Sequence, residues 1–364
     1  MEFYLLDWNL NILKMIESYM SVIWAERFYT SGDFELYLPD TRENSEMFQI
    51  TDGHAMYLMR LDDPTKVGII ENIKHLDKAE EGKMLLVSGH TDDYFLHYRL
   101  ILEQVTYTGN VEQAIRHMIT NAFIASELGF SLRTSDKFLL GPTIGLTDDI
   151  SVQYQGQYID EELAKLCQQY EFGYQTTYDK DTKKFTFNLI QSTDRSMDQT
   201  AVTPVIFSGF MNNVSSQESE KHLPINAAYA YGQGNGAFKF SNGYTDPSLI
   251  NNGLERREGY VDAEDISNQA DALLGVNYAA ILTRQAQAAV DRSKNGSDTA
   301  TADVLPDVTY KYGVDYNLGD IVQVIVNDAN GIGTASYKQR IIEVIEAVDE
   351  TGYTCIPTFE TVAA

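Results

Sequence analysis

The sequence predicts a multidomain protein of the α+β class that is mainly β. A length of 364 residues exceeds what one hydrophobic core usually serves, so two to four units are expected. Alternation of apolar and polar residues dominates both ends of the chain, whereas helical periodicity is found between them. A hydrophobic content of 43%, with 11% aromatic residues, is sufficient for folded cores.

Residues 1–105 are expected to form the first unit, which is rich in β-strands. In SGDFELYLPD (31–40), Phe34, Leu36 and Leu38 recur with a period of two between turn-forming residues. Residues 54–61 predict another strand, and residues 67–90 predict two strands around the polar AEEG turn. Such a run of short strands is typical of a small barrel or sandwich.

Residues 106–200 are expected to form a small α+β unit. TGNVEQAIRHMITNAF (108–123) has apolar residues at helical spacing, with Asn110 as a plausible N-cap. Residues 160–170 predict a second helix capped by Asp160, and residues 172–191 predict a hairpin.

The remaining segments predict a second β-unit that is split in sequence. Residues 192–226 are polar and predict a crossing segment rather than a part of the core. Residues 226–240 predict a lone strand, which needs partners and is expected to find them after residue 305. The strands GDIVQVIV, YKQRIIEVIEAV and GYTCIPTF follow there. The second β-unit would therefore comprise residues 201–245 and 303–364.

A helical insertion is expected to separate the two parts of the second β-unit. Residues 260–296 have helical periodicity that ends at Asn295-Gly296, and the insertion as a whole would comprise residues 246–302.

The charge of the chain excludes stable nucleic-acid binding. There are 27 Lys and Arg against 53 Asp and Glu, a formal net charge of −26. Neutralising phosphates needs a basic surface, and an anionic membrane surface also repels this charge. Solubility is the simplest role for the acidic residues. An acidic wall past which DNA slides without sticking is the alternative.

The two cysteines and the N-terminus indicate synthesis inside the cell. Cys167 falls in a helical pattern and Cys355 in a late strand, so no disulfide framework is expected. MEFYLLDWNL lacks the basic start and apolar core of a signal peptide. No apolar stretch reaches the roughly 18 residues that a membrane span needs.

No motif in the sequence predicts a catalytic, cofactor-binding or metal-binding site. GQGNG (232–236) lacks the Lys-Ser/Thr ending of a phosphate loop, and no zinc-ligand spacing is present. Acidic pairs such as Asp62-Asp63 and Asp92-Asp93 offer the carboxylates of a glycosidase, although 53 acids produce such pairs by chance. Most of these acids are expected to cap turns or helices.

One charged cluster is unusual in so acidic a chain. LERREGYVDAED (254–265) places Glu255, Arg256, Arg257 and Glu258 before a strand-like segment. Adjacent arginines amid acids are expected to be paired, either within the chain or across a subunit boundary. A solvated charged turn and a partner contact are both open.

Four stretches, in order along nearly the whole chain, resemble one known family. They are ERFYTSGDFELYLP, the helix start TGNVEQAI, YGQGNG followed by LERREGYVDAED, and YNLGDIVQV. The set is similar to the hub-type tail proteins of siphophages, which are related to the baseplate hub of contractile-tailed phages. The family's glycine-rich turn often carries a glutamate and is followed by an arginine. Here the turn reads GQGNGAFKF, and Lys239 is the residue available to replace that arginine.

The resemblance implies a fold and a role. It implies two tail-tube-like β-barrel domains, the second split by an insertion, and a homotrimer that forms a pseudo-sixfold ring. The expected role is a structural, non-enzymatic hub in the virion, made in the host cytoplasm, which caps the distal tail tube. Its expected partners are the tube or distal tail protein, the tip or fibre proteins, the tape-measure protein and DNA in transit. Glu255, Arg256, Arg257, Glu258 and Lys239 are the candidate subunit or partner contacts.

Two other functions are open. A cell-wall-degrading enzyme would use acids of the 106–195 segment on glycan or peptide. A host-surface carbohydrate-binding module would use tyrosines, of which the chain has 23, against 16 phenylalanines and 2 tryptophans.

Overall fold

The fold is described from a computed structural model. It describes the residues 1–48, 53–78, 82–102, 105–125, 129, 133–234, 239–264, 266, 278–295, 298–305, 309–327 and 334–362.

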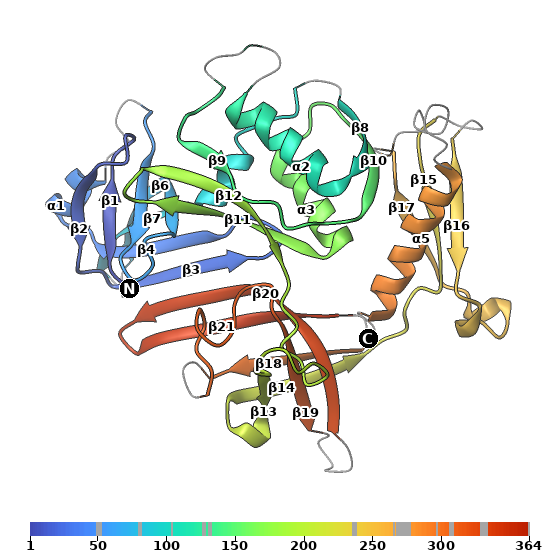
Figure 1. Cartoon of the computed structure of the whole chain (residues 1–364). Helices are drawn as coiled ribbons and strands as arrows, with labels where there is room; N and C mark the ends of the chain where they lie inside the picture. The colour runs from blue at the N-terminus through green and yellow to red at the C-terminus, as the bar shows by residue number, and fades with distance from the viewer. Residues whose placement is uncertain are drawn as a thin grey trace.

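The N-terminal part of the chain forms an antiparallel sheet, drawn in blue in Figure 1. The predicted strand in SGDFELYLPD is confirmed, with Phe34, Leu36 and Leu38 buried on one face. The predictions at 54–61 and 67–90 are confirmed as well. The elements are β1 (Phe3–Leu6), β2 (Ile12–Ile16), β3 (Ser21–Arg27), β4 (Asp33–Pro39), α1 (Arg42–Met47), β5 (Met56–Arg60), β6 (Val67–Lys78) and β7 (Gly82–Thr91).

The middle part of the chain is α+β, with α2 and α3 beside the β11–β12 hairpin (Figure 1). Asn110 caps α2 by accepting a hydrogen bond from the Gln113 amide at 3.1 Å, as predicted. The elements are η1 (Asp92–Leu96), β8 (Val105–Asn110), α2 (Val111–Ile119), the π-helical turn η2 (Thr120–Ile124), β9 (Phe138–Leu140), β10 (Asp149–Tyr154), α3 (Ile159–Tyr170), β11 (Phe172–Asp179) and β12 (Lys184–Gln191).

The predicted cap of α3 is wrong. Its N-cap is Tyr158, which makes no side-chain capping bond, and Asp160 lies in the first turn. The Asp160 carboxylate is instead 3.0 Å from Nδ1 of His97. A carboxylate in the first turn still complements the helix dipole, which explains why the sequence pattern resembles a cap.

The C-terminal part of the chain extends the same sheet. Its elements are β13 (Ile206–Ser208), η3 (Gly209–Met211), β14 (Val214–Lys221), β18 (Asp298–Val304), β19 (Ile321–Asn327), β20 (Thr334–Asp349) and β21 (Gly352–Thr361). Strand β20 pairs with β19 and β21, and it also pairs antiparallel with β3 from the N-terminal part. The result is one eleven-stranded sheet with the order β13-β19-β20-β3-β4-β7-β6-β5-β1-β2, from which β21 branches at β20.

Strands predominate, as the sequence predicts. Among the described residues the strand path ends at β2 and at β13 and does not close on itself. The division into two tube-like barrels therefore stays a prediction.

The polar crossing predicted for residues 192–226 is wrong. Phe207 of β13 and the adjacent Val205 are buried, and β13 pairs in parallel with β19. β14 pairs with β18, so strands from both sides of the insertion meet. A strand of three residues is too short to produce a period in the sequence, which is why polar neighbours concealed it.

The predicted place of residues 226–240 beside the late strands is also wrong. β15 (Ala227–Tyr231) pairs with β16 (Ser241–Thr245) and with β17 (Glu258–Asp262) in a separate three-stranded sheet. α5 (Tyr278–Asn295) packs on this sheet against Ala228 and Ala230, and the unit stands apart at one side of Figure 1. The short turns η5 (Pro247–Leu249) and η6 (Gly253–Glu255) complete the unit.

The local sequence explains both errors in the insertion. SNGYT lacks apolar alternation and gives no strand signal, although it supplies the partner that β15 needs. The helix predicted at 260–296 is confirmed at residues 278–295, which form α5. The first residues of the predicted helix belong instead to strand β17. Residues 265, 267–277 and 296 of the predicted helix lie outside the described residues, as do residues 235 and 236 of GQGNG.

Phe28 is clamped where the three main parts of the chain meet. Its ring is fully buried between two glycines, Gly173 of β11 and Gly319 before β19. A Cβ at either glycine would overlap the ring. The Phe28 amide donates to the carbonyl of Ile342 in β20 at 2.8 Å, so main chain and ring are both fixed.

Replacing Gly319 by alanine is expected to destabilise the fold strongly. Gly319 has φ of +86°, and Gly313 has a similar φ of +79° with no atom near its missing Cβ. We expect Gly313→Ala to lower the free energy of unfolding by about 1 kcal/mol, the cost of the left-handed backbone. Gly319→Ala should cost about 3 kcal/mol because ring overlap is added. Equal losses in urea denaturation would contradict the clamp.

Candidate functional site

A buried charged cluster lies at the junction of the three main parts of the chain. We call Glu26, Lys66, Asp92, Asp93 and Tyr312 the junction cluster. Lys66 Nζ donates to Glu26 Oε2 at 2.7 Å, and the Tyr312 hydroxyl donates to the same oxygen at 2.7 Å. Asp93 accepts from the backbone N–H of Thr176 in β11. Glu26 comes from β3, whereas Tyr312 precedes β19, so the cluster joins segments that are far apart in sequence.

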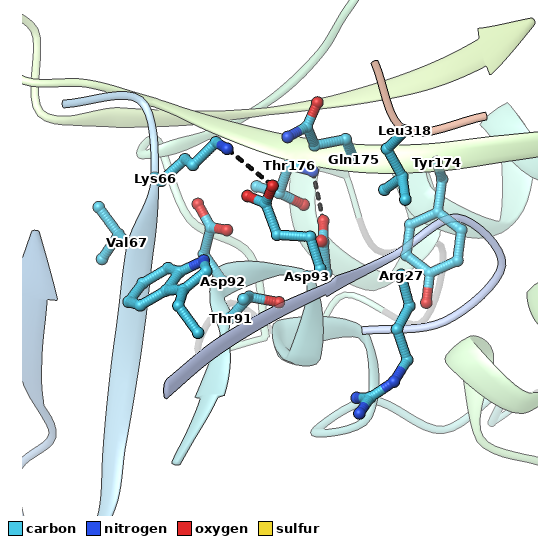
Figure 2. Close-up of a pocket in the computed structure, with 12 residues that line it drawn as sticks. Arg27, Lys66, Val67, Thr91, Asp92, Asp93, Tyr174, Gln175, Thr176 and Leu318 are labelled. Carbon is cyan, nitrogen blue, oxygen red and sulfur yellow. Dashed lines mark hydrogen bonds and ion pairs between the residues drawn. The ribbon is translucent and has the colours of Figure 1, made fainter. Parts of the chain in front are cut away.

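Four residues of the cluster, all except Tyr312, line a very small cavity (Figure 2). Its volume is about 10 Å³, which is about the space that one water molecule needs. Asp92 lies on the Val67 side of the cavity and Asp93 on the Thr176 side. Asp92 Oδ2 is buried and has no hydrogen-bond partner among the described residues. A cavity of this size does not admit a substrate.

Burial raises the pKa of both aspartates. The pKa of Asp92 lies well above its ordinary value because the carboxyl is desolvated and because Asp93 is adjacent. The pKa of Asp93 is raised to about 7, again chiefly by desolvation, although the Thr176 N–H opposes the shift. Glu26 adds a further negative charge nearby, whereas Lys66 compensates it directly. Burial therefore favours the protonated form of both carboxyls below about pH 7.

A second buried ion pair connects the N-terminal sheet to β20. Arg60, at the end of β5, makes a two-bond contact with Glu346, at 2.5 and 3.2 Å. The Tyr353 hydroxyl donates to Glu346 at 2.9 Å, and Arg60 also binds Asp62 at 2.7 Å. Both Arg60 and Glu346 are buried, and the guanidinium lies over the Trp24 ring.

A third buried contact connects β20 to the α+β part. Arg340 Nη1 donates to the Tyr29 hydroxyl at 2.7 Å, and Nη2 donates to Glu171 at 3.0 Å. The Arg340 Nε donates to Ser192 after β12 at 3.0 Å. Two buried charged residues of β20, Arg340 and Glu346, therefore each bind a different part of the chain.

The site residues predicted from the sequence lie in the unit formed by β15, β16, β17 and α5, away from this junction. Arg256 binds Glu258 at 2.5 Å and donates to the Tyr229 hydroxyl at 2.8 Å. Arg257 donates to the carbonyls of Pro224 and Glu255 at 2.5 and 2.8 Å.

Two further residues of the predicted set have other partners. Glu255 accepts from the Asn251 amide at 2.6 Å. Lys239 pairs with Glu264, so the structure does not bring it to the other four.

Sequence reasoning missed the junction cluster. Asp92-Asp93 was visible as an acidic pair, but nothing in the local pattern distinguishes two buried acids from a capped turn. Glu26 and Lys66 occupy strand and turn positions where exposed charges are ordinary, and Tyr312 is one of many tyrosines. These residues come together only in the folded structure, so no local sequence pattern connects them.

The described residues contain neither a metal-binding cluster nor a membrane-spanning helix. No group of three or more His, Cys, Asp or Glu side chains is placed to hold a metal ion. None of the described helices is long and apolar enough to cross a membrane.

The junction aspartates are expected to make stability pH-dependent. Their folded-state pKa is raised above the unfolded value, so the stability that they contribute is complete at low pH and is lost as the pH rises through about 7. Between about pH 5 and about pH 8.5 the unfolding free energy should fall by on the order of 2 kcal/mol. Asp93→Asn should reduce this slope in urea denaturation, because only Asp92 then remains to contribute to it.

A matched control uses an exposed acid. Asp149 lies at the surface, so Asp149→Asn should leave the pH slope unchanged. An Asp93→Asn variant with the slope of the unmodified protein would show that the junction does not hold a protonated aspartate.

Removing one partner of the buried ion pair is expected to destabilise the fold. Arg60→Met leaves Glu346 buried without its cation, and the expected loss is about 3–5 kcal/mol in unfolding free energy. Arg42 and Glu46 form a pair whose side chains are 90% and 58% exposed. Arg42→Met should therefore cost less than about 0.5 kcal/mol. Similar losses for the two variants would be inconsistent with a structural role of Arg60.

The fold is similar to solved tail proteins over almost the whole chain. A 43 kDa tail protein of prophage MuSo2 from Shewanella oneidensis shares 15% identity with a TM-score of 0.58, covering 99% of this chain and 98% of that one. A tail protein from Neisseria meningitidis MC58 shares 14% identity with a TM-score of 0.57, covering 98% and 96%. Prophage tail protein gp18 from Listeria monocytogenes EGD-e shares 12% identity with a TM-score of 0.52, covering 95% and 90%.

The family match is independent of these structures. No curated protein matches the sequence. Residues 2–359 match the family described as siphovirus ReqiPepy6 Gp37-like protein. The resemblance to siphophage tail proteins that the four sequence stretches predict is thus confirmed. The chain belongs to the siphovirus ReqiPepy6 Gp37-like family and has the fold of phage and prophage tail proteins.

Proposed function

We propose that this protein is a structural component of a phage tail that acts as its hub. The observation that supports this role most is the eleven-stranded sheet, which runs unbroken through the N-terminal and C-terminal parts. A single continuous sheet gives each subunit two sheet-bearing units in a fixed relation. Three subunits would then present six such units, which is the number needed to match a six-fold tube.

The outer face of this sheet offers a surface for contact between subunits. Ile23 of β3 lies opposite Ala347 of β20, and Ile345 of β20 lies opposite Ile356 of β21. Directly opposed residues share a sheet face, so these side chains form one apolar patch. Ile23 is 38% exposed and Ile356 is 44% exposed. Apolar side chains exposed together on one sheet face are typical of an interface.

The hub would cap the distal tail tube and connect it to the tip or fibre proteins. Part of the acidic excess would line its channel, where repulsion lets DNA and the tape-measure protein pass. We assign no enzymatic role, because the cavity at the junction cluster has a volume of about 10 Å³, which is too small to admit a substrate.

The cluster of Glu255, Arg256, Arg257 and Glu258 in the insertion is proposed as a contact with an adjoining tail protein. The neighbouring Leu254 is 97% exposed, and an apolar side chain so fully exposed is well placed to enter a partner. Lys239 is assigned to the same contact because it lies in the same unit, between β15 and β16, although it pairs with Glu264.

Native mass spectrometry tests the trimer. The unmodified protein should have a mass near three times 41.0 kDa. Ile23→Glu with Ile356→Glu places two charges in the proposed interface, and burial of unpaired charge should shift the protein to monomers. A double variant that stays trimeric would contradict this interface.

Two single variants complete the design. Val314 is 68% exposed in the C-terminal part and lies outside the proposed patch, so Val314→Glu should leave the trimer intact. Leu254→Glu should also leave it intact, since that residue is assigned to another tail protein. Loss of the trimer in Leu254→Glu would place the charged turn at the subunit boundary instead.

A further inference from the structure

A pocket lies between the N-terminal sheet and the tip of the β11–β12 hairpin. Its volume is about 600 Å³, within the range of small-molecule sites. Tyr4 of β1 lies directly opposite Met59 of β5, and both side chains line the pocket. Leu6 and Leu61 continue the same apolar wall. The wall therefore comes from two paired strands and is rigid.

The hairpin tip covers the opposite side of the pocket. Tyr178 of β11 lines it and is held by a hydrogen bond from its amide to the carbonyl of Thr65 at 2.9 Å. The Tyr178 side chain is buried. Leu10 and Ile12 in the β1–β2 hairpin close one end. The interior is thus lined mainly by aliphatic and tyrosine side chains.

The rim of the pocket is cationic in an otherwise acidic protein. Lys180 and Lys183 line it together with Asp181, so cations outnumber acids among the lining residues of a chain that carries −26. Asp7 does not line the pocket but lies close enough to Lys183 to interact with it. Lys183 Nζ donates to Asn11 Oδ1 at 2.6 Å and so spans the entrance. Lys180 is exposed and has no partner among the described residues. Its ammonium group is available to an incoming anion.

We propose that this pocket binds an amphipathic anion, that is, an aliphatic chain with a carboxylate or phosphate head. The chain would contact Tyr4, Ile12 and Leu61, which are the apolar lining side chains that are still partly exposed, and their burial drives binding. The head would lie between Lys180 and Lys183, which supply charge-assisted hydrogen bonds. This site does not depend on the proposed place of the protein in the tail, since its residues are apart from both proposed contact surfaces.

Calorimetric titration with three ten-carbon probes tests the site. Decanoate and decyl phosphate should bind the unmodified protein at one site per chain, and the tighter of the two identifies the head group. Decanol, which has the same chain without charge, should bind at least about tenfold more weakly. Absence of binding by both anions, or decanol binding as tightly as they do, would overturn the proposal.

Charge reversal locates the site. Lys180→Glu with Lys183→Glu should weaken decanoate binding about tenfold, because both cations become repulsive. Lys239→Glu with Lys294→Glu makes the same change of charge on the insertion and should alter affinity less than about twofold. Equal affinities for the two double variants would overturn the location.

Discussion

The pairing of β3 with β20 is the constraint on which the rest of the structure depends. It connects residues more than 300 positions apart into adjacent strands, with Val22 opposite Val348 and Arg27 opposite Glu343. On the inner face of the sheet, Trp24 of β3 belongs to the N-terminal hydrophobic core and Val344 of β20 belongs to the C-terminal core. The two neighbouring cores therefore share one sheet. The buried contacts of β20 then fix the orientation of every part packed against it.

The cations at the junctions between the parts of the chain are paired with acidic or phenolic groups, whereas many acids lie at the surface. Arg60, Arg340 and Lys66 are placed against carboxylates or phenols where little water reaches, although cations are scarce in this chain. Breaking such pairs is costly because a lone charge remains buried. Many of the other acids lie at the surface, where they favour solubility. The same scarcity makes the two lysines at the rim of the apolar pocket conspicuous.

The sequence predicted the regular elements that have strong local signals. The strand in SGDFELYLPD, the Asn110 cap and the β11–β12 hairpin all follow from periodicity and turn chemistry. The prediction of which strands pair with one another was wrong for β15. Its partners are SNGYT and EGYVD, which have no strand periodicity of their own. The junction cluster was equally hidden, since burial of Asp92 or Glu26 depends on residues that come from the far end of the chain.

Hydrogen exchange read by mass spectrometry at increasing urea concentrations tests most directly whether β3 and β20 unite the two halves. Amides that unfold in one cooperative unit lose protection together. Peptides covering residues 21–27 and residues 340–348 should lose protection at the same urea concentration, because each strand supplies the other's hydrogen bonds. Loss of protection in residues 340–348 at clearly lower urea, while residues 21–27 stay protected, would show that the halves are separate bodies.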